Sequence, residues 1–229
     1  MTKTAIVTGA SSGIGKAIAK KLASEGINVA LVARREDKLT ALAEAINEGT
    51  GGKALAVPVD VSHRIEVESM VRKVEEHFGA IDVYVNNAGL MLNALVTDGQ
   101  VENWEHMIDV NIKGVLYGAN AVIPSMLERK TGHIINIASV SGFEVTKRST
   151  VYSATKFAVR AISMGLEKEL ARTGVRVTNI SPGMVDTDLA RRHAVDRKML
   201  EADDIANAVF YAITQPDYVN VNEITVRPV

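Results

Sequence analysis

The sequence predicts an α/β protein with one doubly wound domain, residues 1–229, whose parallel sheet has about seven strands and helices on both faces. Three observations predict it. Short apolar runs alternate with stretches of helical periodicity, which is typical of βαβ units. The short runs are apolar throughout, as expected for strands buried on both faces. No linker, low-complexity tract or internal repeat divides the chain.

Each element has its own local signal. The first strand ends at a glycine, and a helix follows at once. Residues 27–33 are short and rich in β-branched side chains, whereas 36–48 carries apolar residues at helical spacing. The expected strands are 4–8, 27–33, 53–59, 81–85, 132–138, 175–180 and 222–226. The expected helices are 13–25, 36–48, 63–78, roughly 100–129, 150–172 and 203–214.

The composition excludes several classes of protein. Lys and Arg total 26 against 27 acids, so the net charge of −1 argues against partners such as nucleic acid or anionic lipid. The chain has no cysteine, which excludes disulfides and thiolate chemistry. No apolar run approaches the ~18 residues of a membrane span. The five histidines lack metal-ligand spacing, so no metal site is expected. We expect a soluble cytoplasmic protein without a signal peptide.

A glycine-rich turn joins the first strand to the first helix. It reads Thr8-Gly9-Ala10-Ser11-Ser12-Gly13-Ile14-Gly15. Glycines allow a tight turn and let backbone N–H groups approach a pyrophosphate, which the helix N-terminus also attracts. In isolation such a triplet also occurs in plain turns, but the strand–turn–helix context favours a dinucleotide site. The candidate cofactor contacts here are Gly9, Ser11, Ser12, Gly13, Ile14 and Gly15.

Two arginines follow the second strand, where a carboxylate would hold the ribose 2′-hydroxyl of NAD. The sequence has Ala33 at this position, followed by Arg34 and Arg35. Guanidinium groups suit a 2′-phosphate, so NADP(H) is favoured over NAD(H). The alternative is that both arginines are solvated surface charges.

The next two strands also end in candidate cofactor contacts. Asp60 and Val61 follow the third strand, and the Asp60 carboxylate suits the adenine amino group or an N-cap of the helix near 63. Asn86-Asn87-Ala88-Gly89 follows the fourth strand, and its small residues suit the floor of a cofactor cleft. The candidates there are Asn87, Ala88 and Gly89.

Tyr152 and Lys156 lie four residues apart in an expected helix, so they share one face. A lysine cation nearby would lower the pKa of the phenol, which makes tyrosine usable in proton transfer. As a bare pattern this spacing is common and proves nothing. Ser139 follows the strand 132–138 and could polarise a carbonyl oxygen in the same cleft. Asn111 is a polar residue in the middle of an expected helix.

In order and spacing, these motifs resemble the short-chain dehydrogenase/reductase family over essentially the whole chain. The matching features are Thr8-Gly9-x-x-x-Gly13-x-Gly15, Asn86-Asn87-Ala88-Gly89, Asn111, Ser139, Tyr152-x-x-x-Lys156 and Ser181-Pro182-Gly183. The resemblance implies a Rossmann fold, with Asn111, Ser139, Tyr152 and Lys156 as the catalytic residues. In the family Tyr152 would be the acid and base, Lys156 would also hold the nicotinamide ribose, Ser139 would orient the substrate oxygen, and Asn111 would support a water linking Lys156 to solvent. Pro182, Gly183, Val185 and Thr187 would border the nicotinamide.

Two features depart from the family pattern. Many NADP-using relatives have Lys or Arg where this chain has Ser12, which leaves Arg34, with Arg35 as helper, to bind a 2′-phosphate. The stretch from Asp186 to Ala206 is shorter than the usual substrate lid, which leaves open whether the lid is deleted here. The tail 220–228 resembles a bacterial branch with NADP-dependent 3-hydroxy acid (serine) dehydrogenases and clavulanate-type aldehyde reductases.

The expected function is therefore NADP(H)-dependent hydride transfer between nicotinamide and a small alcohol or carbonyl substrate: an aldehyde, a ketone or a 3-hydroxy/3-oxo acid. The alternative is a catalytically silent NADP(H)-binding sensor. The resemblance also implies a homotetramer or homodimer. Lys147 and Arg148 could attract an acidic substrate, although a solvated loop explains them as well. The candidate substrate-pocket residues are Met91, Asn93, Ser139, Ser141, Glu144, Val145 and Met184.

Overall fold

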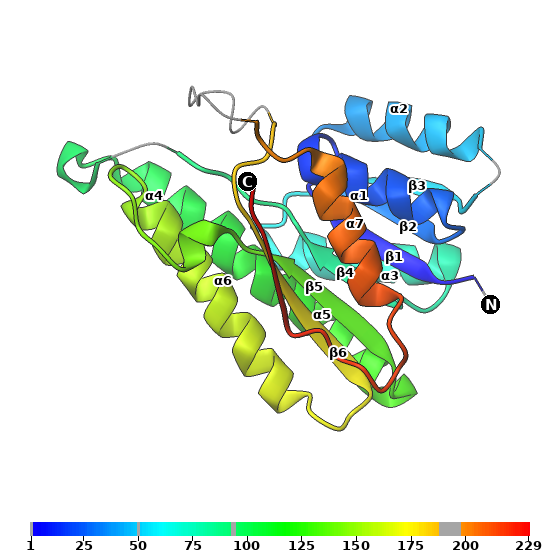
Figure 1. Cartoon of the computed structure of the whole chain (residues 1–229). Coiled ribbons are helices and arrows are strands. Elements are labelled where there is room, and N and C mark those ends of the chain that lie inside the picture. The colour runs from blue at the N-terminus through cyan, green and yellow to red at the C-terminus, as the bar shows by residue number, and fades with distance from the viewer. Residues whose placement is uncertain (1, 50, 93–94, 188–197) are drawn as a thin grey trace.

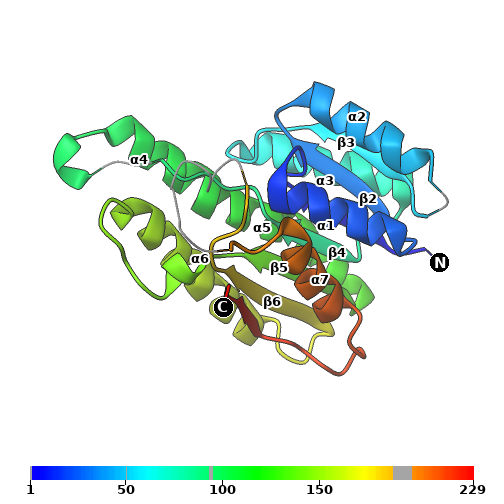
Figure 2. The same cartoon turned by 45° about the horizontal axis from the view of Figure 1, so that its top comes forward.

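A computed structural model of the chain describes residues 2–49, 51–92, 95–187 and 198–229. In these residues, one sheet of seven parallel strands runs in the order β3-β2-β1-β4-β5-β6-β7 (Figures 1 and 2). The predicted doubly wound α/β class is confirmed. The strands are β1 Thr4–Thr8, β2 Asn28–Ala33, β3 Ala54–Pro58, β4 Val83–Asn86, β5 Gly132–Ile137, β6 Val175–Pro182 and β7 Glu223–Val226.

Helices cover both faces of the sheet. The principal helices are α1 Gly13–Ser24, α2 Glu36–Asn47, α3 Arg64–Phe78, α4 Val101–Ile108, α5 Gly114–Arg129, α6 Thr150–Glu169 and α7 Ala202–Ile213. One core cluster packs α1, α2 and α7 against the sheet, and a second packs α3 and α5 against the opposite face. Figure 1 shows α1 and α7 side by side. In the described residues, no helix has the length and apolarity needed to cross a membrane.

The long helix expected over 100–129 is interrupted. A π-helical turn, Asp109–Lys113, separates α4 from α5 and contains Asn111. Such turns widen the backbone locally and occur often at functional sites. The apolar periodicity of the sequence continues through the turn, so it carries no warning of the interruption.

The parallel register collects one end of every strand at one edge of the sheet. Strand β6 runs two residues further than predicted, to Pro182, because Ser181 and Pro182 pair with Thr225 and Val226 of β7. The residues just beyond β1, β4, β5 and β6 therefore lie together at the carboxyl edge. Ligands of open α/β sheets bind at this edge.

Candidate active site

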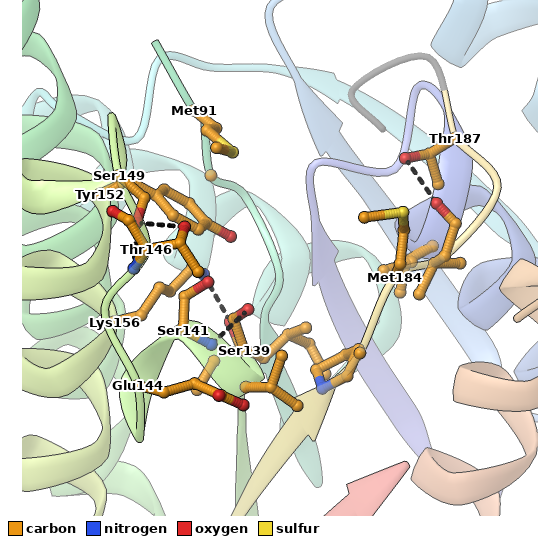
Figure 3. Close-up of a pocket in the computed structure, with 18 of the residues that line it drawn as sticks. Met91, Ser139, Ser141, Glu144, Thr146, Ser149, Tyr152, Lys156, Met184 and Thr187 are labelled. Atoms are coloured by element: carbon orange, nitrogen blue, oxygen red, sulfur yellow. Dashed lines mark hydrogen bonds between the residues drawn. The ribbon is translucent and has the colours of Figure 1, made fainter. Parts of the chain in front are cut away.

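A cavity of about 810 Å³ opens at the carboxyl edge of the sheet (Figure 3). Its lining combines segments from both halves of the chain. In Figure 3, Met184 and Thr187 lie across the pocket from Tyr152 and Ser139. Of the predicted site residues, the lining includes Ile14, Asn87, Gly89, Met91, Ser139, Ser141, Glu144, Tyr152, Lys156, Pro182, Gly183, Met184, Val185 and Thr187.

The glycine-rich turn is held by close backbone approaches. Gly9 and Gly13 adopt positive φ angles of 69° and 52°, which glycine tolerates best. A Cβ atom on Gly15 would overlap the carbonyl oxygen of Gly9. The first turn of α1 can therefore pack against the end of β1 in this way only with glycine at position 15. A Cβ on Gly13 would lie 3.1 Å from Cγ2 of Thr187. The glycine-rich turn and the segment after β6 are therefore in close proximity.

The N-terminus of α1 is open to an anion. Ser12 is the N-cap residue, yet its side chain makes no capping hydrogen bond, and the first turn contains no acid. The first backbone N–H groups of a helix have no partners inside the helix, and the helix dipole favours negative charge there. The turn therefore fits the pyrophosphate of a dinucleotide.

The two arginines beyond β2 have different surroundings. Arg35 donates from Nη2 to the hydroxyl oxygens of Ser11 (2.7 Å) and Ser12 (2.8 Å), so it lies against the turn. Arg34 is more loosely placed, with Nη1 3.7 Å from Oδ2 of Asp60 and its side chain 63% exposed. The Arg35 guanidinium therefore lies at the turn, and that of Arg34 lies beside Asp60 after β3.

Asp60 does not cap the helix that follows it. The N-cap of α3 is His63, whereas the Asp60 carboxylate accepts hydrogen bonds from N–H (3.0 Å) and Oγ (2.7 Å) of Ser62. The N-cap alternative is therefore wrong. Burial raises the pKa of Asp60, but the Ser62 hydrogen bonds and Arg34 outweigh it, so the pKa lies below its ordinary value. Val61, a predicted cofactor contact, is buried in the second core cluster.

The segment after β4 is tied to the end of β1. The Thr8 hydroxyl oxygen accepts from N–H of Asn87 and of Ala88, both at 2.9 Å. The Asn87 side chain donates in return to the Thr8 carbonyl (2.8 Å). These bonds fix the cavity floor relative to the glycine turn.

Ser139, Tyr152 and Lys156 converge at the cavity from β5 and α6. Burial raises the pKa of Tyr152, and its hydrogen bond with Ser139 partly offsets this. The sequence predicted the opposite direction, through a lysine effect. Lys156 instead donates from Nζ to the Ile137 carbonyl (2.9 Å) and lies 5.8 Å from the centroid of the Tyr152 ring. Burial lowers the pKa of Lys156 to about 8.

Asn111 binds the backbone next to the cavity. Its side-chain oxygen accepts from N–H of Leu90 (2.9 Å), and its amide donates to the Leu90 carbonyl (2.9 Å) and to Oγ1 of Thr155 (3.0 Å). The side chain is 1% exposed. Asn111 thus connects the π-helical turn, the segment after β4 and α6.

The substrate side of the cavity differs in part from the prediction. Val145 is 60% exposed and is absent from the described lining, unlike Glu144 and Thr146 on either side of it. Its assignment to the substrate pocket stays a prediction. Asn93 lies outside the described residues. Lys147 and Arg148 do line the cavity.

Arg227 and Pro228 also line the cavity, although no pattern in the sequence predicted them there. They follow β7, which pairs with β6 so that Val226 lies opposite Pro182. The only feature of the sequence that could have indicated these two cavity residues is the order of the strands. A last parallel strand next to β6 would place its following residues beside Pro182 and Gly183.

Comparison with known proteins agrees with this geometry. The family model described as short chain dehydrogenase matches residues 3–198. An uncharacterized oxidoreductase of Staphylococcus saprophyticus is 58% identical over 228 residues, with 99% of this chain and 97% of the relative covered. An uncharacterized oxidoreductase of Staphylococcus aureus is 56% identical with the same coverage.

Solved structures of dehydrogenases are also similar to this chain. A closed form of serine dehydrogenase complexed with NADP+ is 35% identical, with a TM-score of 0.90 over 97% of this chain and 94% of that one. An alcohol dehydrogenase from the archaeon Thermococcus sibiricus, complexed with 5-hydroxy-NADP, is 33% identical. Its TM-score is 0.91 over 99% of this chain and 96% of that one.

Proposed function

The chain belongs to the short-chain dehydrogenase family, and from this premise we propose that it is an NADP(H)-dependent alcohol dehydrogenase or carbonyl reductase. Its substrate is a small aldehyde, ketone or 3-hydroxy/3-oxo acid, or the corresponding alcohol. One observation carries the proposal: Ser139, Tyr152 and Lys156 line the same cavity as Ile14 of the glycine turn and Thr187. A dinucleotide bound along the turn would therefore end beside these three side chains.

NADP(H) is the cofactor that suits the described residues. The start of α1 offers unpartnered N–H groups to the pyrophosphate, and Arg34 and Arg35 offer positive charge to a 2′-phosphate. The structures of serine dehydrogenase and of the Thermococcus enzyme hold NADP+ and an NADP derivative respectively, which supports the same choice. When bound, the cofactor supplies or accepts the hydride.

Tyr152 is the proton donor for reduction in this proposal. Its pKa lies above the ordinary value of 10, so at neutral pH the phenol is in the protonated form, which can protonate a carbonyl oxygen. Ser139 hydrogen-bonds the same phenol and can donate to the same substrate oxygen, so it orients the carbonyl. In the oxidative direction the phenolate accepts the proton back.

Lys156 stabilises the phenolate and holds the ribose. With a pKa of about 8 it is largely protonated at pH 7, and it supplies a cation at a buried position 5.8 Å from the tyrosine ring. Asn111 fixes the Leu90 backbone and Thr155, one residue before Lys156. We assign Asn111 a positioning role within the proton path to Lys156.

We also propose that the chain forms a homodimer or homotetramer. Helices α5 and α6 expose large apolar side chains: Leu116 is 43% exposed, Phe157 40% and Met164 51%. Burying such side chains against a second copy would stabilise the assembly. The cytoplasmic location expected from the composition stays a prediction.

Fluorescence titration with NADPH and with NADH tests the cofactor assignment, and NADPH oxidation with aldehydes, ketones and 3-oxo acids tests the reaction. We expect tight NADPH binding with turnover. The matched variant Tyr152→Phe should bind NADPH as before and lose about 10²- to 10⁴-fold in kcat. Tight binding without turnover on any carbonyl would favour the silent sensor, and turnover by Tyr152→Phe would overturn the mechanism.

A further inference from the structure

The charged residues at the cavity are mostly cations. Leaving Lys156 aside, the described lining contains Lys147, Arg148 and Arg227 against the single carboxylate of Glu144. This imbalance contrasts with the whole chain, whose net charge is −1. A cleft lined by one sign of charge attracts ligands of the opposite sign.

Arg227 is the best anchored of the three cations. The N–H of Gly183 donates to the Val226 carbonyl (2.7 Å), so the backbone before Arg227 is fixed beside the cavity. Strand β7 is also bound to α6, where Arg160 makes two contacts with the Glu223 carboxylate, at 2.7 and 3.1 Å. Pro228 packs against Gly183, where a Cβ would lie only 3.0 Å from Cδ of the proline.

Arg227 already binds a carboxylate. Its Nη2 atom donates to Oε1 of Glu144 at 3.0 Å, and Glu144 lies on the same side of the cavity as Ser139 and Ser141 (Figure 3). Both side chains are about half exposed, at 53% and 56%. An exposed ion pair of this kind contributes little net free energy, so a competing carboxylate can replace Glu144 at small cost. The planar guanidinium can then bind that carboxylate through two N–H groups.

From these contacts we propose that Arg227 recognises a carboxylate on the substrate, and that Glu144 holds the guanidinium in place until that carboxylate replaces it. Lys147 and Arg148, which precede α6 in an exposed loop, add attraction without fixing the anion. This inference rests on the proposed oxidoreductase function and narrows its substrates to carbonyl or hydroxy acids. Arg227 is thus a specificity residue, and Glu144 is its positioning partner.

The experiment compares an acid with its neutral ester. NADPH-dependent reduction of acetoacetate and of methyl acetoacetate is measured for the wild type, Arg227→Gln, Glu144→Gln and the control Arg72→Gln, an exposed arginine on α3 that contacts Ser69. The readout is the acid-to-ester ratio of kcat/KM. We expect Arg227→Gln to lower this ratio about tenfold through KM for the acid, because a charge-assisted hydrogen bond is lost. Glu144→Gln should raise the acid-to-ester ratio about two- to fivefold, because the substrate carboxylate then no longer has to replace a surface ion pair. The control Arg72→Gln should leave the ratio unchanged.

A binding assay keeps the inference testable without turnover. In the Tyr152→Phe background, 3-hydroxybutyrate and its methyl ester are titrated into the NADP+ complex, and the acid should bind more tightly only when Arg227 is present. Equal binding of acid and ester, or equal losses for both in Arg227→Gln, would overturn the role of Arg227. NADPH binding without turnover would instead count against the proposed function alone.

Discussion

The two walls of the cavity are built in different ways. The cofactor wall, residues 8–15 and 86–89, depends on backbone geometry: positive φ angles, an approach too close for a Cβ atom, and hydrogen bonds between Thr8 and Asn87. The substrate wall, residues 141–148 with 227 and 228, consists largely of exposed side chains. An exposed side chain of the substrate wall can be replaced without moving the backbone, whereas a Cβ added at Gly9 or Gly15 of the cofactor wall would force neighbouring atoms to shift.

Gly15→Ala should break the cofactor wall. The added methyl would overlap the Gly9 carbonyl and press on the Asn87 side chain, so the start of α1 must move. We expect a loss of about 1–3 kcal/mol in the free energy of unfolding and, by the same energy, about a tenfold to hundredfold weaker affinity for NADPH. Chemical denaturation and fluorescence titration measure the two effects.

Gly165→Ala is the matched control. Gly165 lies in α6, and an added Cβ would meet no atom within 4 Å. Alanine is the better helix former by about 1 kcal/mol, so this variant should be slightly more stable and bind NADPH normally. If both glycine variants behaved alike, the close approach at Gly15 would not be what limits the first wall.

The same difference explains what the sequence could predict. The seven strands and the glycine turn were predictable because each is a contiguous pattern whose chemistry is local: apolar runs, helical spacing and glycines next to a helix start. Ser139, Tyr152 and Lys156 were predictable as a group only through their order along the chain. Their convergence at the cavity follows from the parallel sheet.

The substrate wall was less predictable, since it joins segments far apart in the sequence. Arg227 lies 83 residues from its partner Glu144, and no periodicity relates them. Val145 shows a second cause: the exposed loop after Ser141 has no regular spacing from which the direction of a side chain could be inferred. The direction of the Tyr152 pKa shift was mispredicted because burial, which depends on tertiary packing, raises the pKa by more than the Ser139 hydrogen bond lowers it.

Arg34→Ala and Arg35→Ala sharpen the account of the cofactor wall. Each variant removes a positive charge near the expected 2′-phosphate, so affinity for NADPH should fall about tenfold to hundredfold, as for a charge-assisted hydrogen bond. Affinity for NADH should change far less. Arg35→Ala should have the larger effect, because Ser11 and Ser12 hold its guanidinium against the turn. Equal losses for both cofactors would show that the arginines support the turn rather than select the phosphate.

Lys156, which lies between the two walls, should make stability depend on pH. Its pKa is lowered from 10.5 to about 8 by burial, so between these values the unfolded chain binds more protons than the folded one. The free energy of unfolding contributed by this group therefore rises with pH from about 8 upward, by up to a few kcal/mol. Denaturation of the wild type and Lys156→Met from pH 7.5 to 9.5 measures the difference. Parallel pH profiles would contradict the lowered pKa.

The smallest effect is expected at Val145. A substitution there tests whether neighbouring residues of the substrate wall differ in their contact with substrate. Its side chain is 60% exposed and is absent from the described cavity lining, whereas Glu144 and Thr146 on either side contribute to that lining. Val145→Ser should therefore change the free energy of unfolding by less than about 0.5 kcal/mol. Its KM and kcat should stay within about twofold of the wild type, because an energy difference of about 0.5 kcal/mol corresponds to roughly a twofold change in an equilibrium constant. Glu144→Gln, one residue away, should alter selectivity between acids and esters.

If Val145→Ser instead raised KM strongly with NADPH affinity intact, the loop would have to turn this side chain inward when substrate binds. The substrate wall would then be shaped by the ligand, in contrast to a cofactor wall whose shape is set by the backbone before any ligand arrives.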